Sequence, residues 1–198
     1  MRFFIALEIP EECRDQLRIV QNHLEEIIPG IRITDNSKLH LTIAFVGEQS
    51  DKLENDLVEV LRKATLDIPP FTITPAYIDG FPELHHAYVL WAGVKGDIDK
   101  LMVIRERIKD GLASLGLDPD ERRYIPHIAI AKTNHSFSLR PEQEAKMQKI
   151  MSSPFDPIQI SSIKLFESIP QDGFHKHNTL AEIRLIQKTK EAEENYLL

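Results

Sequence analysis

The chain has 198 residues, of which 42% are hydrophobic and 28% are charged, and its formal net charge is −7. This composition is ordinary for a globular protein, and the length fits one substantial domain or two small lobes that share a core. The negative charge argues against a broad nucleic-acid-binding surface, but it is compatible with a local cationic cleft for a short RNA end or a nucleotide.

The sequence contains no signal for a membrane or for secretion. No run approaches the roughly 20 apolar residues that a membrane-spanning helix needs. The apolar run near the N-terminus, Phe3 to Leu7, is short and is followed by acidic residues, unlike a secretory signal. Cys13 is the only cysteine, so no intramolecular disulfide can form. Together these features predict a cytoplasmic protein with no membrane partner.

Hydrophobic periodicity divides the first half of the chain into alternating strands and helices. Apolar residues from Leu17 to Ile27 recur at helical spacing, and Pro29 with Gly30 would end that helix. Pro75 favours a sheet edge or a bulge in the strand that contains it. We expect strands over 2–10, 38–47 and 70–81, and helices over 11–28 and 51–65.

The second half of the chain repeats this order. We expect strands over 86–94, 126–132 and 155–168, helices over 97–116 and 140–153, and a closing strand over 178–186. The charged tail, 187–198, is expected to be frayed or loosely helical. Because no linker is long enough to separate independent domains, we expect one domain over 1–186, with pseudo-repeat halves of about 1–81 and 86–168.

The β-α-β-α-β order, present twice, predicts an α+β fold with two pseudo-symmetric lobes. Each lobe would be a mainly antiparallel sheet with helices on its outer side, and the active cleft would lie between the lobes. The repeat is one of pattern only, because the sequences of the two halves barely match.

One histidine opens the equivalent strand in each half: His40 in "HLTIAFVG" and His127 in "HIAIAK". Alternate residues of a strand share a face, so each histidine should have small or hydroxylated neighbours beside it, a poor core surface but a suitable cleft floor. The predicted cleft-facing sets are His40, Thr42 and Ala44, and His127, Ala129 and Ala131. The predicted core-facing sets are Leu39, Leu41, Ile43 and Phe45, and Ile128 and Ile130.

Two imidazoles across a cleft favour paired proton transfer. Histidine titrates near pH 6.5, so one ring can be neutral while the other is protonated. Cleavage of a phosphate ester without a metal needs such a pair, because one ring removes a proton from water and the other protonates the leaving oxygen. Thr42 could donate its hydroxyl to a phosphoryl oxygen.

These segments resemble the motifs of the two-histidine (2H) phosphoesterase superfamily, and most closely its RNA 2′,3′-cyclic phosphodiesterase branch, once named 2′-5′ RNA ligase. The resemblance spans nearly the whole chain through "RFFIALEIP", "HLTIAFVGE", "IPHIAIAK" and "LFESIPQDGFHKHNTLAEIRL". It implies hydrolysis of a 2′,3′-cyclic phosphate on RNA or a nucleotide to a 2′-phosphate, with no metal or other cofactor. By motif position it implies that His40 donates a proton to the 3′ leaving oxygen and that His127 accepts one.

The chain departs from the family pattern at two positions. Ala129 stands where the family usually has threonine or serine. The missing hydrogen bond would be worth about 1.5–3 kcal/mol, or roughly tenfold to a hundredfold in rate. Lys132 stands where the family tends to have arginine, so the charge is kept but the bidentate fork is not. Lys132 has the parity of the core-facing residues, so it would reach the cleft only if the strand twists or ends there. Lys132 and Arg123 are candidate phosphate-binding residues, and for Arg123 the alternative is a solvated charge.

The remaining histidines predict no metal site. His85 and His86 are adjacent and would point to opposite faces of a strand. His175 and His177 have same-face spacing, but no further ligand with convincing spacing joins them. A surface turn is the simplest interpretation of this segment. Alternatively, it flanks the cleft, and Phe174 or His175 stacks on a base.

The sequence thus predicts a monomeric enzyme that binds RNA or a nucleotide bearing a 2′,3′-cyclic phosphate. Two alternatives stay open: a phosphodiesterase for linear 2′-5′ linkages, and a nucleotide- or RNA-binding module with weak or no catalysis, which Ala129 favours. The chain has no phosphate-binding glycine loop and no nucleophile elbow, so no motif supports ATP-driven ligation.

Overall fold

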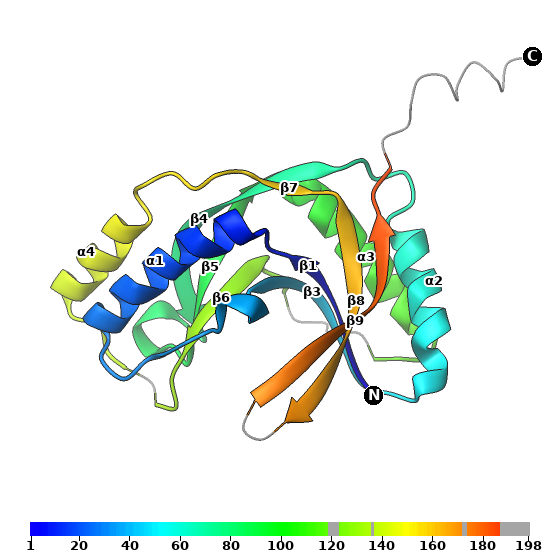
Figure 1. Cartoon of the computed structure of the whole chain (residues 1–198), viewed down its shortest axis with the longest axis horizontal. Helices are drawn as coiled ribbons and strands as arrows, with labels where there is room; N and C mark the ends of the chain where they lie inside the picture. Colours follow the sequence, from blue (N-terminus) through cyan, green and yellow to red (C-terminus); the bar gives the residue numbers. More distant parts are fainter. Residues whose placement is uncertain (119–122, 136, 172–173, 187–198) are drawn as a thin grey trace, which may run out of the picture.

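The structure is a computed structural model that describes residues 1–118, 123–135, 137–171 and 174–186 (Figure 1). The predicted charged tail, 187–198, lies outside the described residues. The described strands form one nine-stranded sheet in the order β7-β4-β5-β6-β3-β1-β8-β9, with β2 paired to β6. All of these pairings are antiparallel, as the α+β prediction required.

The strands are β1 (Arg2–Glu8), β2 (Arg32–Ile33), β3 (His40–Glu48), β4 (Phe71–Phe81), β5 (Val89–Gly96), β6 (His127–Lys132), β7 (Ile158–Ile160), β8 (Ser162–Gln171) and β9 (Phe174–Arg184). The α-helices are α1 (Glu11–Ile27), α2 (Glu54–Ala64), α3 (Ile98–Ser114) and α4 (Pro141–Ile150). Three short 3₁₀ turns are η1 (Asn36–Lys38), η2 (Asp51–Leu53) and η3 (Leu84–His86).

The two expected lobes are the two ends of this single curled sheet. One lobe contains β1, β3, β8 and β9, the other contains β4 to β7, and a short antiparallel pairing of β3 with β6 joins them at Leu41 and Ile128. Each lobe takes strands from both halves of the chain, because β4 pairs with β5 and β7, whereas β8 pairs with β1. The two strands that begin with histidine therefore lie side by side at the centre of the sheet.

The helices pack in two pairs, α1 with α4 and α2 with α3, against the buried face of the sheet (Figure 1). The inner side of α1 is fixed to the centre of the sheet by Gln21, whose buried amide donates to the carbonyls of Ile130 and Thr34, both at 2.8 Å. Leu41 and Ile128 are fully buried beneath the helices. The opposite face of these strands is left for the site.

Several segments differ from the sequence prediction, and two of them bear on the site. The expected strand over 155–168 is split at Ser161 into β7 and β8, because the chain crosses there from one lobe to the other. The expected surface turn near His175 and His177 is instead part of β9, whose pairing with β8 continues to Gln171. In β4, the register shifts between Pro75 and Tyr77, which confirms the predicted bulge.

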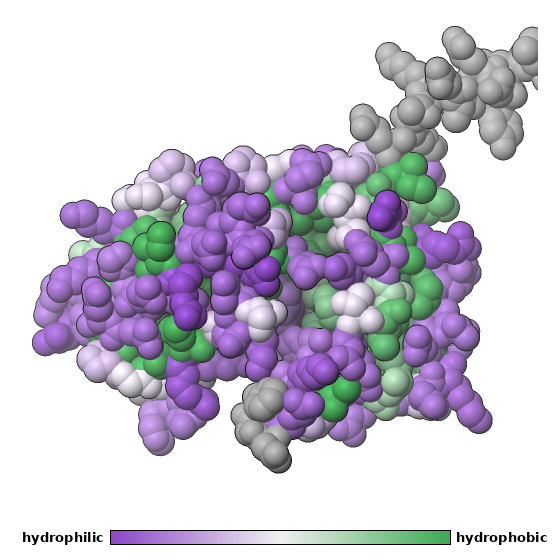
Figure 2. Space-filling model, in the orientation of Figure 1, coloured by the Kyte–Doolittle hydropathy of each residue, from purple (hydrophilic) through white to green (hydrophobic). Residues whose placement is uncertain are grey.

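The surface in the view of Figure 2 is mostly hydrophilic, and hydrophobic residues gather between α1 and α4 and beside α2. Within the described part of the chain, no helix combines the length and the hydrophobicity that crossing a membrane requires.

Candidate active site

The structure brings the two motif histidines together on one face of the sheet. His40 is the first residue of β3 and His127 is the first residue of β6. The antiparallel register, with Leu41 opposite Ile128, sets His40 beside Ala129 and sets His127 beside its neighbour on β3, Thr42. Because Leu41 and Ile128 point into the core, the alternation of side chains turns both imidazoles to the opposite, half-open face.

The two rings are held in the same way. Nδ1 of His40 lies 2.7 Å from the carbonyl of Lys38, and Nδ1 of His127 lies 2.7 Å from the carbonyl of Ile125. A carbonyl only accepts hydrogen bonds, so we assign the Nδ1 proton to both rings. In each ring Nε2 is therefore left to exchange a proton with a ligand.

Burial lowers the pKa of both histidines below the ordinary value. For His40, loss of solvent is the main cause, the Lys38 carbonyl opposes it, and the charges of Lys132 and His127 lower the pKa further. For His127, loss of solvent lowers the pKa and the carbonyl of Ile125 opposes it. Both rings remain partly exposed. The strand register, and not the pKa shift, shows that the two histidines are diagonal neighbours across the strand pair.

Matching β-bulges interrupt both histidine strands. In the pairing of β1 with β3, Ile43 is an extra residue between Thr42 and Ala44. In the pairing of β5 with β6, Ile130 is an extra residue between Ala129 and Ala131. A bulge reverses the faces to which the side chains after it point, up to the next register shift, which in β3 comes between Phe45 and Gly47.

The bulges overturn part of the predicted face assignment. Ala44 was expected beside His40 and is 3% exposed in the core, whereas Phe45 was expected in the core and is 59% exposed. Ala131 is likewise buried. The prediction assumed an uninterrupted alternation, and a bulge cannot be read from the pattern of apolar residues.

The second bulge turns Lys132 to the site. Lys132 pairs with Val89, and Ala129 pairs with Trp91. Val89 and Trp91 are two residues apart on β5 and share a face, so Lys132 and Ala129 lie on that face as well. The ammonium group of Lys132 lowers the pKa of both His40 and His177, which places its charge near both rings. Lys132 thus lies on the face that carries the histidines, and its charge acts on two of the imidazoles.

Arg123 lies elsewhere. It is exposed and lines a groove of about 570 Å³ beside α3, together with Lys109 and Tyr124, and neither motif histidine lines this groove. Tyr124 connects the groove wall to β3, because its hydroxyl donates to the carbonyl of Thr42 at 2.9 Å. Arg123 is therefore not part of the histidine cluster.

His177 is a third imidazole at the site, which the sequence interpretation missed. Its ring lies on β9, 5.4 Å from the ring of His40 and 4.9 Å from that of Phe4. Burial first, and then the charges of His40 and Lys38, lower the pKa of His177 to about 4, so this ring is neutral near pH 7. The signal that could have revealed it is the continued alternation of β9 through its hairpin.

His175, which shares a face with His177 by spacing, has a partner of its own: its Nδ1 lies 3.1 Å from Oγ of Ser168. Across the described residues, no three His, Cys, Asp or Glu side chains are grouped to hold a metal ion. The side chain of Phe174 lies outside the described residues. His85 and His86 lie in η3 rather than in a strand.

Aromatic rings flank each motif histidine. The ring of Phe4 lies 5.2 Å from that of His40. On the other side, the rings of Phe81 and Trp91 lie 4.9 Å and 5.5 Å from that of His127. These rings exclude water from one side of each imidazole, which explains why burial dominates both pKa shifts.

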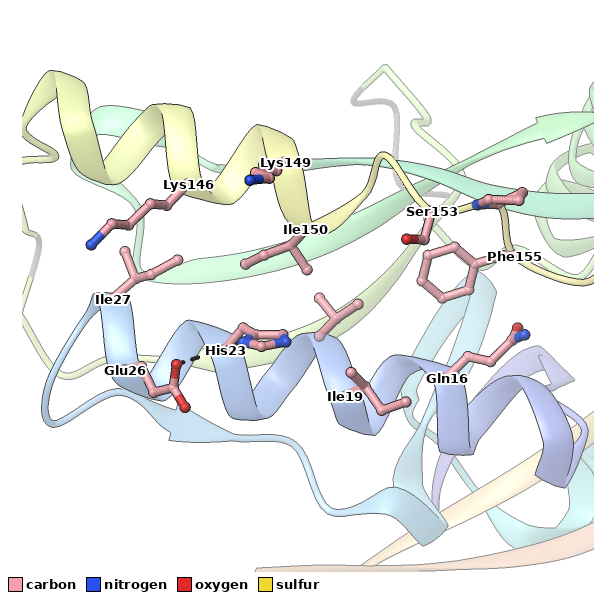
Figure 3. Close-up of a pocket in the computed structure, with 12 residues that line it drawn as sticks. Gln16, Ile19, His23, Glu26, Ile27, Lys146, Lys149, Ile150, Ser153 and Phe155 are labelled. Carbon is pink, nitrogen blue, oxygen red and sulfur yellow. Dashed lines mark ion pairs between the residues drawn. The ribbon is translucent and has the colours of Figure 1, made fainter.

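A second groove, of about 650 Å³, lies between α1 and α4 (Figure 3). Ile19, Ile27 and Ile150 point into it, and its one histidine, His23, is 3.6 Å from Glu26. Neither His40 nor His127 lines this groove.

Comparison with known proteins identifies relatives of this fold and sequence. The family model for the 2′-5′ RNA ligase superfamily matches residues 5–168. A Methanocaldococcus jannaschii protein named RNA 2′,3′-cyclic phosphodiesterase is 29% identical over 85% of this chain and 91% of its own length. A Thermotoga maritima protein with the same name is 25% identical over 85% and 87%. The crystal structure of Escherichia coli LigT in its apo form has a TM-score of 0.72 and 23% identity, covering 94% of this chain and 98% of LigT.

Proposed function

Because the chain belongs to the 2′-5′ RNA ligase superfamily, we propose that it hydrolyses the 2′,3′-cyclic phosphate ends of RNA or nucleotides to 2′-phosphates. The observation that carries this proposal is the matched pair His40 and His127: two imidazoles on adjacent strands, on one face, each with Nδ1 at a backbone carbonyl. The names of the two relatives above support the class of substrate.

The proposed reaction is an in-line displacement at phosphorus. Nε2 of His127 removes a proton from water as the water oxygen attacks the phosphorus. The bond between phosphorus and the 3′ oxygen breaks, and that oxygen takes the proton of Nε2 on His40. The products are a 2′-phosphate and a free 3′ hydroxyl, and proton exchange with solvent restores both rings.

The acid and base assignment rests on the family motif, because the two rings have the same local setting. In each ring Nδ1 lies at a backbone carbonyl, which favours the protonated ring, and burial is the main cause of a lowered pKa. The roles of His40 as the proton donor and His127 as the proton acceptor are therefore taken from the motif alone. Both imidazoles act directly, so the proposed mechanism uses no metal and no cofactor.

Two further side chains are assigned to the phosphoryl group. Thr42, which neighbours His127 across the strand pair, can donate its hydroxyl to a phosphoryl oxygen. Lys132 would supply a positive charge that attracts the phosphate. Such a local charge matters because the chain as a whole has a net charge of −7 and would otherwise repel an anionic ligand. Arg123 has no assigned part at the reacting phosphate, because it lines the groove beside α3.

The test is turnover of nucleoside 2′,3′-cyclic phosphates by the wild type and by His40→Ala and His127→Ala. General acid or base catalysis typically contributes about 10²- to 10⁴-fold, and each variant should lose that much in kcat. His23→Ala on α1 is the matched control and should keep the wild-type rate. A chelator should leave the rate unchanged. Near-native rates in both site variants would refute the mechanism.

Phosphorus NMR of the product separates the related activities. A 2′-phosphate is the expected product of a cyclic phosphate, whereas cleavage of a linear 2′-5′ linkage would identify the first alternative. The second candidate, a nucleotide- or RNA-binding module, is favoured by Ala129, which removes one hydroxyl from the face that carries the histidines. Tight binding of a nucleoside 2′-phosphate without turnover of the cyclic form would support it.

A further inference from the structure

The third imidazole at the site, His177, is partly buried, and neither of its ring nitrogens has a hydrogen-bond partner among the described residues. Its close neighbours are rings, Phe4 at 4.9 Å and His40 at 5.4 Å, with interplanar angles of 68° and 80°. By contrast, Nδ1 of each motif histidine lies at a backbone carbonyl, and Nδ1 of His175 lies at Ser168. Polar groups withdrawn from water nearly always have a partner, so the nitrogens of His177 are available to a ligand.

His177 reaches the site from a hairpin that extends beyond the rest of the sheet. Strand β8 pairs with β1 only as far as Glu167, whereas its pairing with β9 continues to Gln171. His177 pairs with Ser168, the first residue past the end of the pairing with β1. Figure 1 shows this end of β8 and β9 standing out from the other strands. His177 therefore belongs to a wall of the site, beside the floor that carries the motif histidines.

The two halves of the site differ in the side chains around their histidines. Thr42, which neighbours His127 across the strand pair, carries a hydroxyl, whereas Ala129, which neighbours His40, carries none. The imidazole of His177 lies beside His40, the histidine without a hydroxyl neighbour. A polar ring is thus present in the half of the site where position 129 supplies no hydrogen-bond donor.

We propose that His177 donates a hydrogen bond to the phosphoryl group of the substrate, as a hydroxyl at position 129 would; this inference rests on the proposed function and adds a substrate-binding residue to it. A neutral imidazole has one N–H donor. His177 is neutral near pH 7, because burial and the charge of His40 lower its pKa to about 4, so it donates without competing with His40 for a proton. A hydrogen bond spans about 2.7–3.2 Å, so a phosphoryl group held at Nε2 of His40 lies within reach of a ring centred 5.4 Å away.

The first experiment compares kcat/KM of the wild type and of His177→Phe on a nucleoside 2′,3′-cyclic phosphate near pH 7. Phenylalanine keeps an aromatic ring against Phe4 and His40 but has no N–H. A hydrogen bond to a charged group corresponds to about tenfold to a hundredfold, so the variant should lose that factor. His23→Phe makes the same replacement on α1, in the groove of Figure 3, and should keep the wild-type rate. Thermal unfolding near pH 7 checks that both variants remain folded.

The second experiment introduces Ala129→Thr into the wild type and into His177→Phe, with Ala129→Val as the control in both. If the ring and the hydroxyl serve the same phosphoryl group, the ratio of kcat for threonine to kcat for valine should be larger in the His177→Phe background, where the hydroxyl replaces the lost donor. The variant with threonine should then recover most of the rate that His177→Phe loses. Equal ratios in the two backgrounds would overturn the inference that His177 acts in place of the hydroxyl.

The third measurement does not depend on turnover. Calorimetry should show that His177→Phe weakens the binding of inorganic phosphate and of adenosine 2′-phosphate by a similar factor, about tenfold or more, because the contact is to the phosphoryl group. If the wild type hydrolyses no cyclic phosphate but the variant shows this weaker binding, the proposed function fails and the contact stands. Unchanged binding of phosphate by the variant would refute the contact, whatever the rate of turnover.

Discussion

Restoring a hydroxyl at position 129 should raise the rate of the proposed reaction. Ala129 pairs with Trp91, is partly exposed on the site face, and neighbours His40 across the strand pair. This position mirrors that of Thr42, which neighbours His127. Ala129→Thr would therefore give each histidine a hydroxyl across the strand pair.

The size of the effect follows from the partial exposure of this position. A hydrogen bond to a charged group is worth about 1.5–3 kcal/mol, and the lower part of that range applies where solvent competes. About 1.5 kcal/mol corresponds to about a tenfold higher rate. The gain should be in kcat, because the charge on the phosphoryl oxygens changes as the reaction proceeds.

The assay is kcat and KM on a nucleoside 2′,3′-cyclic phosphate, with Ala129→Val as the matched control. Valine has the shape of threonine but no hydroxyl, so any effect of added volume beside Trp91 appears equally in both variants. The ratio of kcat for Ala129→Thr to kcat for Ala129→Val measures the contribution of the hydroxyl. A ratio near one would refute the assigned role of position 129, and Ala129→Ser repeats the test with a smaller side chain.

Three further outcomes are expected. The pKa of His177 falls from 6.5 to about 4 on folding, so between these pH values the unfolded chain binds more protons than the folded one, and the stability of the fold decreases as the pH drops. The variant His177→Phe should therefore lose less thermal stability than the wild type between pH 6.5 and about pH 4. Equal losses in the two proteins would contradict the assignment. Lys132→Gln should raise KM and should raise the pKa of His40, which moves the limb of the pH–rate profile that His40 controls to higher pH. Lys132→Arg keeps the charge and should behave as the wild type. An unchanged profile in Lys132→Gln would argue against a position of Lys132 near the ring of His40. Gly93→Ala would place a methyl group against the ring of Tyr77, and the free energy of unfolding measured with denaturant should fall by about 1–3 kcal/mol. If the ring of Tyr77 is the cause, the same substitution should cost less in a Tyr77→Ala background.

Much of the fold follows from local patterns in the chain. Helix α1 begins and ends within one residue of the prediction, because its apolar residues have helical spacing and Pro29 with Gly30 follow at once. The segment over 155–168 was predicted as one strand because its β-forming residues continue through Ser161. In the structure it is two strands, because the residues before Ser161 pair with β4 and those after it pair with β1. Local preference sets that a segment is extended, whereas long-range pairing sets which lobe it joins.

The candidate site divides in the same way. The motif around His40 and His127 could be recognised from residue types and spacing, because an acid–base pair needs particular side chains in each half of the chain. Phe45 was assigned to the core and His177 to a turn, since a bulge and an extended hairpin arise from pairing between distant strands. Lys132 was left undecided for the same reason.

The sequence by itself determined the secondary structure of most segments, the α+β class and the two histidines, because these depend on local propensity, on periodicity and on the identity of side chains. Only the tertiary structure decided that one continuous sheet sets the histidine strands side by side, and that His177, Phe45 and Lys132 reach the same face. The physical reason is that one extra residue in a strand reverses the side chains after it, up to the next register shift. Which residue is the extra one depends on the register of pairing with the neighbouring strand, so the strand's own sequence does not identify it.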